Sequence, residues 1–328
     1  MQTILVTGGA GYIGSHAVKA LCDEGYDVKV IDNLSKGHLS AVDSRAEPNK
    51  IDLEDYKAVY RFFQHNKIDA VMHFAGSIEA GLSMKEPADF LRNNVMNSQN
   101  LLEAMRRNSV MKIIFSSTAA VYGNPENVPI KENDPTDPTN YYGVTKLMFE
   151  NILKKYEHFY DLKYVALRYF NAAGADAGGE IGEDHDPETH LIPIVLQHIL
   201  GLRDKVSVYG TDYDTKDGTC VRDYVHVSDL IDAHILALKY LLDGGASDIF
   251  NIGSGSGFTV KEVINAVEKV TGKKVVAEES ARRAGDPAVL IADSVKIREK
   301  LGWNPKKDDI ETILQDAWRW HQNKPNGY

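Results

Sequence analysis

The sequence predicts an α/β protein whose first domain is a doubly wound parallel sheet and whose second, smaller C-terminal domain is also α/β. Along the first half of the chain, short runs rich in β-branched residues alternate with longer segments of helical pattern. A glycine-rich turn directly follows the first of these runs. The length of 328 residues, at roughly 150 residues per domain, indicates two domains.

The first predicted strand, Thr3–Thr7, leads into a glycine-rich turn, Gly8-Gly9-Ala10-Gly11-Tyr12-Ile13-Gly14, where the first helix begins. Side chains at Gly8, Gly11 or Gly14 would obstruct the sharp turn, the approach of backbone N–H groups to a pyrophosphate, or the packing of the helix. The amides and positive dipole end of the helix would face the phosphates. The turn predicts a dinucleotide site, against the plainer alternative of a tight strand-to-helix connection.

The second predicted strand, Val28–Ile31, ends at Asp32, about twenty residues beyond the glycine turn, where the acidic residue of a Rossmann-type sheet meets the ribose hydroxyls. A 2′-phosphate about 5 Å from this carboxylate would cost roughly 3 kcal/mol per charge at an effective dielectric near 20. The sequence therefore favours NAD over NADP. The alternative for Asp32 is a solvated residue that ends a strand.

The segment after Asp32 is polar and predicts a loop around the adenosine end of the cofactor, with Asn33 and Lys36 as contacts. A short strand is expected over 50–53, where Asp52 and Leu53 would meet the adenine. Asp52 could accept a hydrogen bond from the adenine amino group or could cap a helix over 54–66, and the sequence leaves both open.

The next predicted strand, 68–76, ends in Phe74-Ala75-Gly76, and the cofactor would lie across this strand end. Within the strand, His73 is expected to be a structural histidine rather than a catalytic one. A helical stretch over 93–107 and a strand over 111–118 follow.

A loop over 123–140, which holds four prolines, delivers the chain to a long helix that runs from Tyr141 to about residue 160. Tyr142 and Lys146 lie four residues apart near its start, so their Cβ atoms share one face at about 5–6 Å. The pKa of a tyrosine is ordinarily near 10, and a neighbouring ammonium would favour the phenolate, which can act as a base. The alternative for Lys146 is an ordinary solvated helix lysine.

The character of the chain changes at Asn171, after a strand over 163–170. Residues 172–186 are rich in Gly, Asp and Glu and predict a mobile surface loop that opens the smaller domain. A helix over 191–202 and a strand over 206–209 are expected next, and a helix over 227–242 would return to the main sheet. The predicted domains are residues 1–171, with 225–252 returning to them, and residues 172–224 with 253–328.

The formal charge of −10 argues against a nucleic acid or an anionic membrane as partner. The two cysteines, Cys22 and Cys220, are too few for a disulfide framework or a cysteine-based metal site, and no metal is expected. No stretch approaches about 18 uninterrupted apolar residues, and the first residues lack a signal-peptide pattern. These features predict a cytoplasmic protein.

Eight segments in order resemble the extended short-chain dehydrogenase/reductase family along nearly the whole chain, and within it most closely the enzymes that epimerise UDP-hexoses at C4. The segments are Thr7–His16, His73–Gly76, Asn93–Val95, Ser116–Gly123, Tyr142–Lys146, Arg168–Gly174, Asp217–Val227 and Arg282–Asp286. The resemblance implies an isomerase of galactose metabolism that retains NAD through turnover and takes a UDP-sugar as substrate. It also implies a homodimer formed through the helices near 97–107 and 146–160.

The resemblance assigns the catalytic roles to three residues. Tyr142 would be the general base, Lys146 would bind the nicotinamide ribose and lower the tyrosine pKa, and Thr118 would share a proton with the sugar 4-hydroxyl. Further cofactor contacts implied in the same way are Asn94, Ser116 and Tyr169.

The substrate contacts implied by the resemblance lie in the second half of the chain. Arg222 and Arg283 would bind the UDP phosphates, because the planar guanidinium gives two charge-assisted hydrogen bonds. The other contacts are Asn171 for a diphosphate or sugar oxygen, Asp286 for the uridine ribose, Tyr209 for the uracil region, and His190, Leu191 and Leu290. The plainer alternatives are surface ion pairs for the arginines, a strand-end turn for Asn171 and a loop cap for Asp286.

Three positions depart from the family pattern. Ser77-Ile78-Glu79 stand where a lysine often follows the Phe-Ala-Gly segment, so Ile78 removes one contact to the NAD phosphates. His190 replaces a frequent asparagine before Leu-x-Pro. Leu290 stands where some members carry a bulky tyrosine, and the smaller side chain could admit N-acetylated sugars.

The implied reaction is the reversible C4 epimerisation of UDP-galactose and UDP-glucose through a 4-keto intermediate, without net oxidation. A 4-epimerase of UDP-N-acetylhexosamines or of UDP-glucuronate is the alternative. A nucleotide-sugar 4,6-dehydratase needs an acidic pair directly after Thr118, where Ala119 and Ala120 stand. A non-catalytic NAD-binding regulator would not need to keep Thr118, Tyr142 and Lys146 together.

Overall fold

The computed structural model describes residues 1–283 and 286–328, which divide into two compact units of several segments each. The first unit consists of Met1–Gly123, Thr136–Arg168 and Ile231–Phe250, and the second of Asn124–Pro135, Tyr169–Leu230 and Asn251–Tyr328. Residues 124–135, which were expected in the first domain, cluster with the second unit. Within that unit, Asn251 Nδ2 donates to the carbonyl of Ile130 at 2.9 Å.

Seven strands form one sheet in the order β11-β6-β5-β4-β1-β2-β3. Their bounds are β1 Thr3–Thr7, β2 Asp27–Asp32, β3 Glu47–Lys50, β4 Ala70–His73, β5 Lys112–Thr118, β6 Lys163–Tyr169 and β11 Asp248–Ile252. The pairs β1–β2, β1–β4, β2–β3 and β4–β5 are parallel. The chain builds the sheet outward from β1 to β3 and then in the other direction from β4, which confirms the doubly wound, Rossmann-type sheet.

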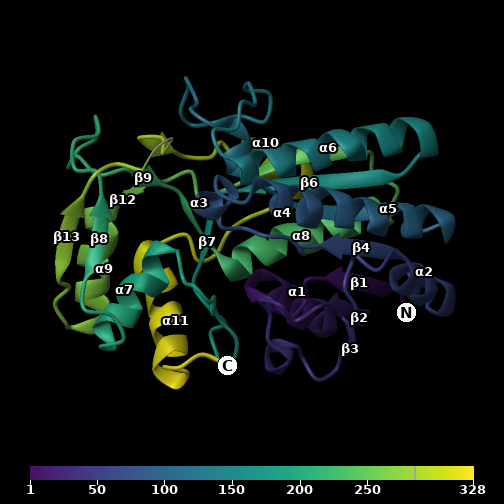
Figure 1. The fold of residues 1–328 in the computed structure, drawn as a ribbon, viewed down its shortest axis with the longest axis horizontal. Helices are drawn as coiled ribbons and strands as arrows, with labels where there is room; N and C mark the ends of the chain where they lie inside the picture. The colour runs from purple at the N-terminus through teal and green to yellow at the C-terminus, as the bar shows by residue number, and fades with distance from the viewer. Residues whose placement is uncertain (284–285) are drawn as a thin grey trace. The chain divides into compact units, whose positions relative to one another are not determined.

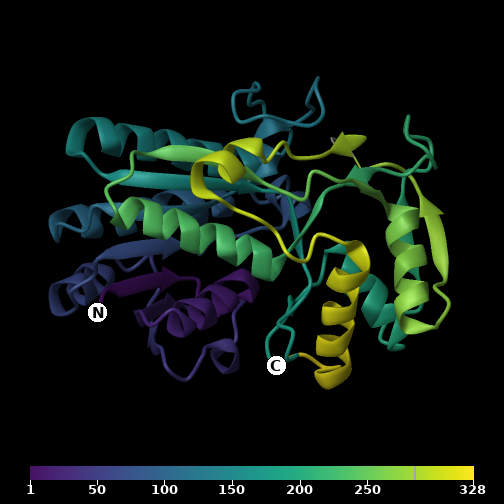
Figure 2. The same cartoon turned by 180° about the vertical axis from the view of Figure 1, so that it is seen from behind.

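Helices cover both faces of this sheet (Figures 1 and 2). On one face, α2 (Tyr56–His65), α5 (Asn97–Arg107) and α6 (Tyr141–Tyr160) bury their apolar side chains against alternate residues of the strands, such as Leu5, Val71 and Ile113. The helices α1 (Tyr12–Asp23) and α8 (Val227–Leu242) lie on the other face. Shorter helices are α3 (Ala80–Ser83), α4 (Pro87–Leu91), a π-helix (Arg92–Met96) and two 3-10 turns (Leu39–Ala41 and Ala119–Tyr122).

The second unit is built from small sheets and four helices. Its strands are β7 Asn171–Ala173, β8 Val206–Tyr209, β9 Val221–Arg222, β10 Tyr224–His226, β12 Phe258–Thr259, β13 Ala277–Ser280 and β14 Val289–Leu290. Its helices are α7 Leu191–Ile199, α9 Val260–Thr271, α10 Val295–Leu301 and α11 Ile310–Asn323. The core of this unit lies between α7, α9 and α11, where Val195, Val263 and Ile313 are fully buried.

One local prediction was wrong. The strand expected over 50–53 lies at Glu47–Lys50, because it is the edge strand of the sheet, where exposed polar residues and a proline are tolerated. Of the two roles left open for Asp52, the helix cap belongs to Asp55, which accepts from the amide of Ala58. Within the described residues, no helix combines the length and apolar character needed to cross a bilayer.

Candidate functional site

The glycine turn after β1, Gly8–Gly14, forms a concave stretch of backbone, here called the glycine cradle, that has no room for side chains at Gly8 or Gly14. Gly8 has a φ of +73°, and a Cβ added there would lie 2.6 Å from the amide nitrogen of Ala75. A Cβ at Gly14 would lie 2.0 Å from the carbonyl oxygen of Gly8. Gly11 is the N-cap of α1, and its own amide donates to the carbonyl of Gly8 at 3.2 Å. The turn therefore presents bare backbone at a helix N-terminus, as the pyrophosphate of a dinucleotide requires.

Asp32 ends β2 beside this turn. Its Oδ2 accepts from the amide of Ala10 at 3.0 Å and its Oδ1 from the amide of Leu34 at 2.8 Å. The first of these bonds joins the acidic residue to the glycine turn across a separation of more than twenty positions. Tyr12 and Ile13 lie at the start of α1 beside this bond, so the structure brings the predicted phosphate and ribose contacts together.

The residues predicted for the adenosine end have partners of their own. Asn33 Nδ2 donates to Asp52 Oδ2 at 2.8 Å, while Asp52 Oδ1 accepts from the amide of Glu54 at 2.8 Å. Lys36 forms an ion pair with Glu79, with its Nζ 3.4 Å from Glu79 Oε1. The side chain of Leu53 is buried in the core, which leaves only its backbone available to a cofactor.

The end of β4 is held by a buried amide side chain. Asn94, in the π-helix, accepts from the amide of Ser77 at 2.7 Å and donates to the carbonyl of Ser77 at 2.9 Å and to Thr145 Oγ1 at 3.1 Å. A Cβ added at Gly76 would lie 3.1 Å from Asn94 Oδ1. Asn94 thus fixes the segment Phe74-Ala75-Gly76-Ser77 against α6, and π-helical turns of this kind are frequent at functional sites.

Tyr142 and Lys146 share the buried face of α6, as predicted. The Nζ of Lys146 donates to the carbonyl of Ser116 at 2.9 Å and lies 5.8 Å from the centroid of the Tyr142 ring. Burial lowers the pKa of Lys146 to about 8. Thr118, at the end of β5, is 8% exposed and its hydroxyl accepts from the amide of Ala120 at 3.1 Å. The structure therefore brings together the predicted catalytic residues of the first unit.

Two groups that position this face of α6 were not predicted. Ser83 Oγ accepts from the amide of Tyr142 at 3.0 Å, at the first turn of the helix. Farther along α6, the buried Glu150 accepts from Ser117 at 2.6 Å and from the guanidinium of Arg168 at 2.6 and 3.0 Å. A glutamate beside Phe149 on the buried face of the helix is the signal by which the second group could have been found.

His73 has hydrogen-bond partners at both ring nitrogens. Its Nδ1 lies 2.6 Å from Thr7 Oγ1 and its Nε2 lies 2.8 Å from Ser98 Oγ. Burial, with a smaller contribution from the charge of Lys146, lowers the pKa of His73 to about 3. The neutral ring joins β1, β4 and α5, which is the structural role expected from the sequence.

In the second unit the predicted uridine and phosphate residues form one group. Arg222 forms an ion pair with Asp286 and also donates to the carbonyl of Val221 at 2.8 Å. The guanidinium carbon of Arg283 lies 4.1 Å from the centroid of the Tyr209 ring. Leu290 on β14 is the strand partner of Arg222 on β9. The motif 282–286 also contains Ala284 and Gly285, which lie outside the described residues.

Tyr169 and Asn171 lie at the start of the second segment of the second unit. The amide and the Nδ2 of Asn171 both donate to the carbonyl of Asp223, each at 3.0 Å. The carboxylate of Asp223 is fully buried and accepts from Ser254 at 2.7 and 2.8 Å, from Ala292 at 3.0 Å and from Gly255 at 3.1 Å. Burial raises the pKa of Asp223 to about 6 against the opposing effect of these bonds. Asp223 positions the strand ends around Asn171 and had no predicted role.

His190 and Leu191 lie at the start of α7, where His190 is the N-cap and Leu191 packs against the core. The side chain of His190 contacts Glu183, so the imidazole belongs to a local acidic cluster. Burial acts to lower the pKa of the neighbouring His185, but the carboxylates of Glu183 and Glu188 raise it to about 10.

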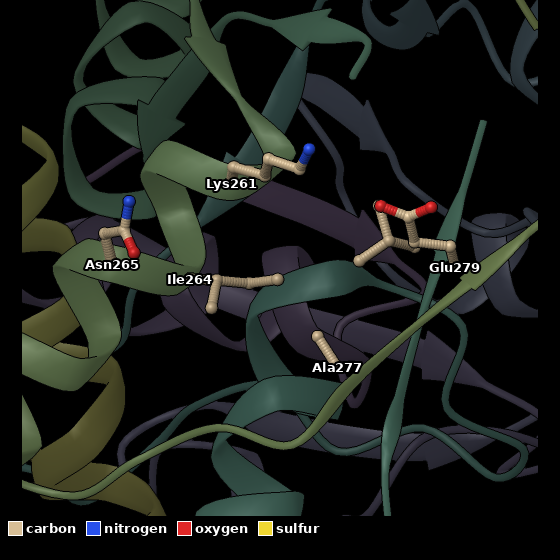
Figure 3. Close-up of a pocket in the computed structure, with 6 residues that line it drawn as sticks. Lys261, Ile264, Asn265, Ala277 and Glu279 are labelled. Atoms are coloured by element: carbon tan, nitrogen blue, oxygen red, sulfur yellow. The ribbon is translucent and has the colours of Figure 1, made fainter. Parts of the chain in front are cut away.

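A separate open hollow lies on the second unit between α9 and the β8–β13 pair (Figure 3). Its lining is Val208, Lys261, Ile264, Asn265, Ala277 and Glu279. None of these is a residue predicted for cofactor or substrate, and Lys261 and Glu279 stand on opposite sides of the hollow. The candidate functional residues therefore lie elsewhere in the unit.

Comparison with known proteins gives consistent results. The model of the NAD dependent epimerase/dehydratase family matches residues 4–253. The chain is 55% identical over 327 residues to UDP-glucose 4-epimerase from Lacticaseibacillus casei, an alignment that covers 100% of this chain and 99% of the relative. The structure of UDP-glucose 4-epimerase from Bifidobacterium longum in complex with NAD+ and UDP aligns with a TM-score of 0.95 at 38% identity, covering 100% of both chains. The UDP-Glc/GlcNAc 4-epimerase from Campylobacter jejuni aligns with a TM-score of 0.86 at 43% identity, covering 98% of this chain and 100% of that chain.

Proposed function

The chain belongs to the NAD dependent epimerase/dehydratase family, and from this membership we propose how its residues divide the work of the reaction. The enzyme is an NAD-dependent isomerase that interconverts UDP-glucose and UDP-galactose at C4. The observation that carries the assignment of residues is the buried pair on α6, where Lys146 faces the ring of Tyr142 next to the end of β5.

Tyr142 removes the proton of the sugar 4-hydroxyl. The ammonium of Lys146, 5.8 Å from the centroid of the ring, favours the phenolate electrostatically. The carbonyl of Ser116 holds that ammonium in place. Bound NAD would supply the reversible hydride acceptor for C4 of the sugar, so that the reaction needs no net oxidant.

Thr118 lies at the end of β5, where its hydroxyl can exchange a hydrogen bond with the sugar 4-hydroxyl. The two residues after it, Ala119 and Ala120, form the start of a short 3-10 turn. Neither carries an acid or a base, so no side chain at this position can eliminate water from C5 and C6. This supports epimerisation over 4,6-dehydration.

The cofactor is held by bare backbone at Gly8, Gly11 and Gly14 and by the carboxylate of Asp32. Since Ile78 replaces a lysine, no cation from that position reaches the phosphates. The helix N-terminus of α1 supplies the positive potential instead.

The UDP moiety is bound by the group in the second unit. Arg222 and Arg283 supply charge to the diphosphate, Asp286 binds the uridine ribose and Tyr209 the uracil region. Asn171, held by the backbone of Asp223, offers its side chain to a diphosphate or sugar oxygen. Because Arg222 already pairs with Asp286, the phosphate and ribose contacts are fixed relative to each other.

UDP-N-acetylhexosamines are a second class of substrate, and the side chain at position 290 favours them. Leu290 is part-buried on β14 next to Arg222 and lacks the length of a tyrosine. The aligned structure from Campylobacter jejuni is named for both sugar types. A Leu290→Tyr variant should lose turnover of UDP-N-acetylglucosamine by about tenfold or more while UDP-galactose turnover changes little. Equal losses for both sugars would contradict this role.

The assembly is a homodimer formed through α5 and α6. Met96, Met148, Phe159 and Tyr160 are large apolar side chains that are 40–68% exposed on or beside these helices. An exposed apolar face of this kind is typical of a subunit interface.

We assign the protein to the cytoplasm, because Cys22 and Cys220 are both free thiols.

The proposal is tested by purifying the protein without added NAD, denaturing it and measuring released NAD, and by supplying the native protein with UDP-galactose. Close to one NAD per chain and formation of UDP-glucose are expected. A protein that carries no NAD and forms no UDP-glucose when NAD is added would overturn the assignment.

A further inference from the structure

A cluster of two imidazoles and two carboxylates lies in the loop before α7. Glu183, His185, Glu188 and His190 each offer one nitrogen or oxygen atom, and these four atoms lie within 4.8 Å of one another. All four residues come from an eight-residue stretch of the second unit, far from the α6 pair in sequence. The reaction at C4 uses none of the first three.

The contacts inside the cluster are close and mostly between unlike charges. His185 Nδ1 lies 3.3 Å from Glu183 Oε1 and 3.5 Å from Glu188 Oε2. His190 Nδ1 contacts Glu183 Oε1 and lies 4.0 Å from Glu188 Oε1. The four donor atoms therefore converge on one small volume.

One buried oxygen in the cluster has no hydrogen-bond partner. The Glu188 side chain is only 2% exposed, and its Oε1 accepts from the amides of Thr189 and His190 at 2.7 and 2.8 Å. Its Oε2 is buried without a hydrogen bond and points toward His185. A neighbour of opposite charge, His185 Nδ1, lies 3.5 Å away, and a cation between the two atoms would complete the environment of this oxygen.

The donor set selects the class of cation. Imidazole nitrogens and carboxylate oxygens are both ligands of the borderline ion Zn²⁺, and four protein ligands are typical of a tetrahedral structural zinc site. The two carboxylates carry a charge of −2, which one divalent ion neutralises once both imidazoles have released a proton to bind it. Calcium and magnesium prefer sets made only of oxygen atoms.

The surrounding structure supports the cluster from outside. Trp320 Nε1 on α11 donates to the carbonyl of Glu183 at 3.2 Å, and the hydroxyl of Tyr328 accepts from the amide of Gly182 at 3.0 Å. These contacts hold the backbone that carries the ligands, as outer contacts do in metal sites. His190 is 46% exposed, which leaves a path for an ion from solvent.

We propose that Glu183, His185, Glu188 and His190 form a structural Zn²⁺ site, in which the ion cross-links residues 183–190 of the loop before α7. The site has four protein ligands and no open position, so its role is to fix the backbone from which α7 and Leu191 begin rather than to activate water. The sequence analysis expected no metal because only cysteine-based sites were considered. The proposal does not depend on the substrate of the enzyme.

The test uses the full-length protein with its bound NAD. After treatment with EDTA and removal of the chelator, ZnCl₂ is titrated and zinc is measured by plasma mass spectrometry after gel filtration. One zinc per chain is expected for the wild type and for Glu180→Gln, a matched change on the same loop. Glu188→Gln should bind zinc at least about tenfold more weakly, since even outer contacts contribute this much to metal affinity.

Two further measurements separate a metal site from an ion-pair cluster. Zinc should raise the unfolding temperature of the wild type and of Glu180→Gln but not of Glu188→Gln. Cobalt added to the metal-free wild type should give the intense visible absorption of four-coordinate Co²⁺, a readout that needs no variant. A wild type that binds no zinc, an unchanged affinity in Glu188→Gln, or a cobalt spectrum of six-coordinate type would each overturn the proposal.

Discussion

The two units carry their functional groups in different ways. In the first unit, the cradle at Gly8 and Gly14 and the pair of Tyr142 and Lys146 are formed by residues within six positions of one another on single turns of the chain. In the second unit, Arg222 reaches Asp286 across 64 positions. The comparison indicates that helix geometry sets the spacing of the proposed catalytic pair, which Ser116 and Ser83 then hold in place. The proposed substrate group depends instead on the tertiary packing of β9 with β14. The variants below test that difference.

The largest effect is expected at Tyr142. Tyr142→Phe keeps the ring and the buried contacts of α6 but removes the proton-transfer group, which contributes about 10²–10⁴-fold to catalysis. We expect kcat for UDP-galactose to fall by that factor while the NAD content of the purified protein stays unchanged. Steady-state kinetics and NAD release measure the two quantities. A variant with near wild-type kcat would show that another group is the base.

The next effect tests the glycine cradle. A Cβ at Gly14 would lie 2.0 Å from the Gly8 carbonyl, so Gly14→Ala must displace backbone, at a cost of about 1–3 kcal/mol or more. We expect a lower free energy of unfolding and loss of bound NAD, measured by denaturant titration and NAD release. The control is Gly81→Ala on α3, where an added Cβ meets no atom within 4 Å. If both variants keep NAD equally, the cradle is not the cofactor site.

A third effect concerns recognition in the second unit. Arg222→Lys keeps the charge but loses the planar fork that pairs with Asp286 and that we propose binds phosphate. We expect KM for UDP-galactose to rise about tenfold with little change in kcat, because a hydrogen bond to a charged group contributes about 1.5–3 kcal/mol. Arg282→Lys is the control, since Arg282 pairs with the exposed Asp212. A fall in kcat with KM unchanged would place Arg222 in the chemistry instead of in recognition.

The difference between local geometry and tertiary packing also decides which features could be predicted from the sequence. The elements β1, α1, α6, β8 and α8 begin at or next to their predicted residues, because glycine spacing, prolines and apolar periodicity are local signals. The roles of Asn94 and Asp223 were not predicted from the residues, because each depends on partners more than thirty positions away, such as Thr145 and Ala292. The strand β3 was misplaced because its residues are polar and it lies at the sheet edge.

The last prediction concerns how kcat depends on pH through the charge of Lys146. Burial lowers the pKa of Lys146 to about 8, so the ammonium keeps its proton below that pH and loses it above. The support for the Tyr142 phenolate is therefore lost as the pH rises, and kcat should fall about tenfold between pH 7 and 9, since one pKa unit corresponds to a factor of ten. Lys146→Arg keeps its charge throughout this range, so its residual kcat should show no such decline. A decline near pH 8 in both proteins, measured at saturating substrate, would assign the titration to a different group.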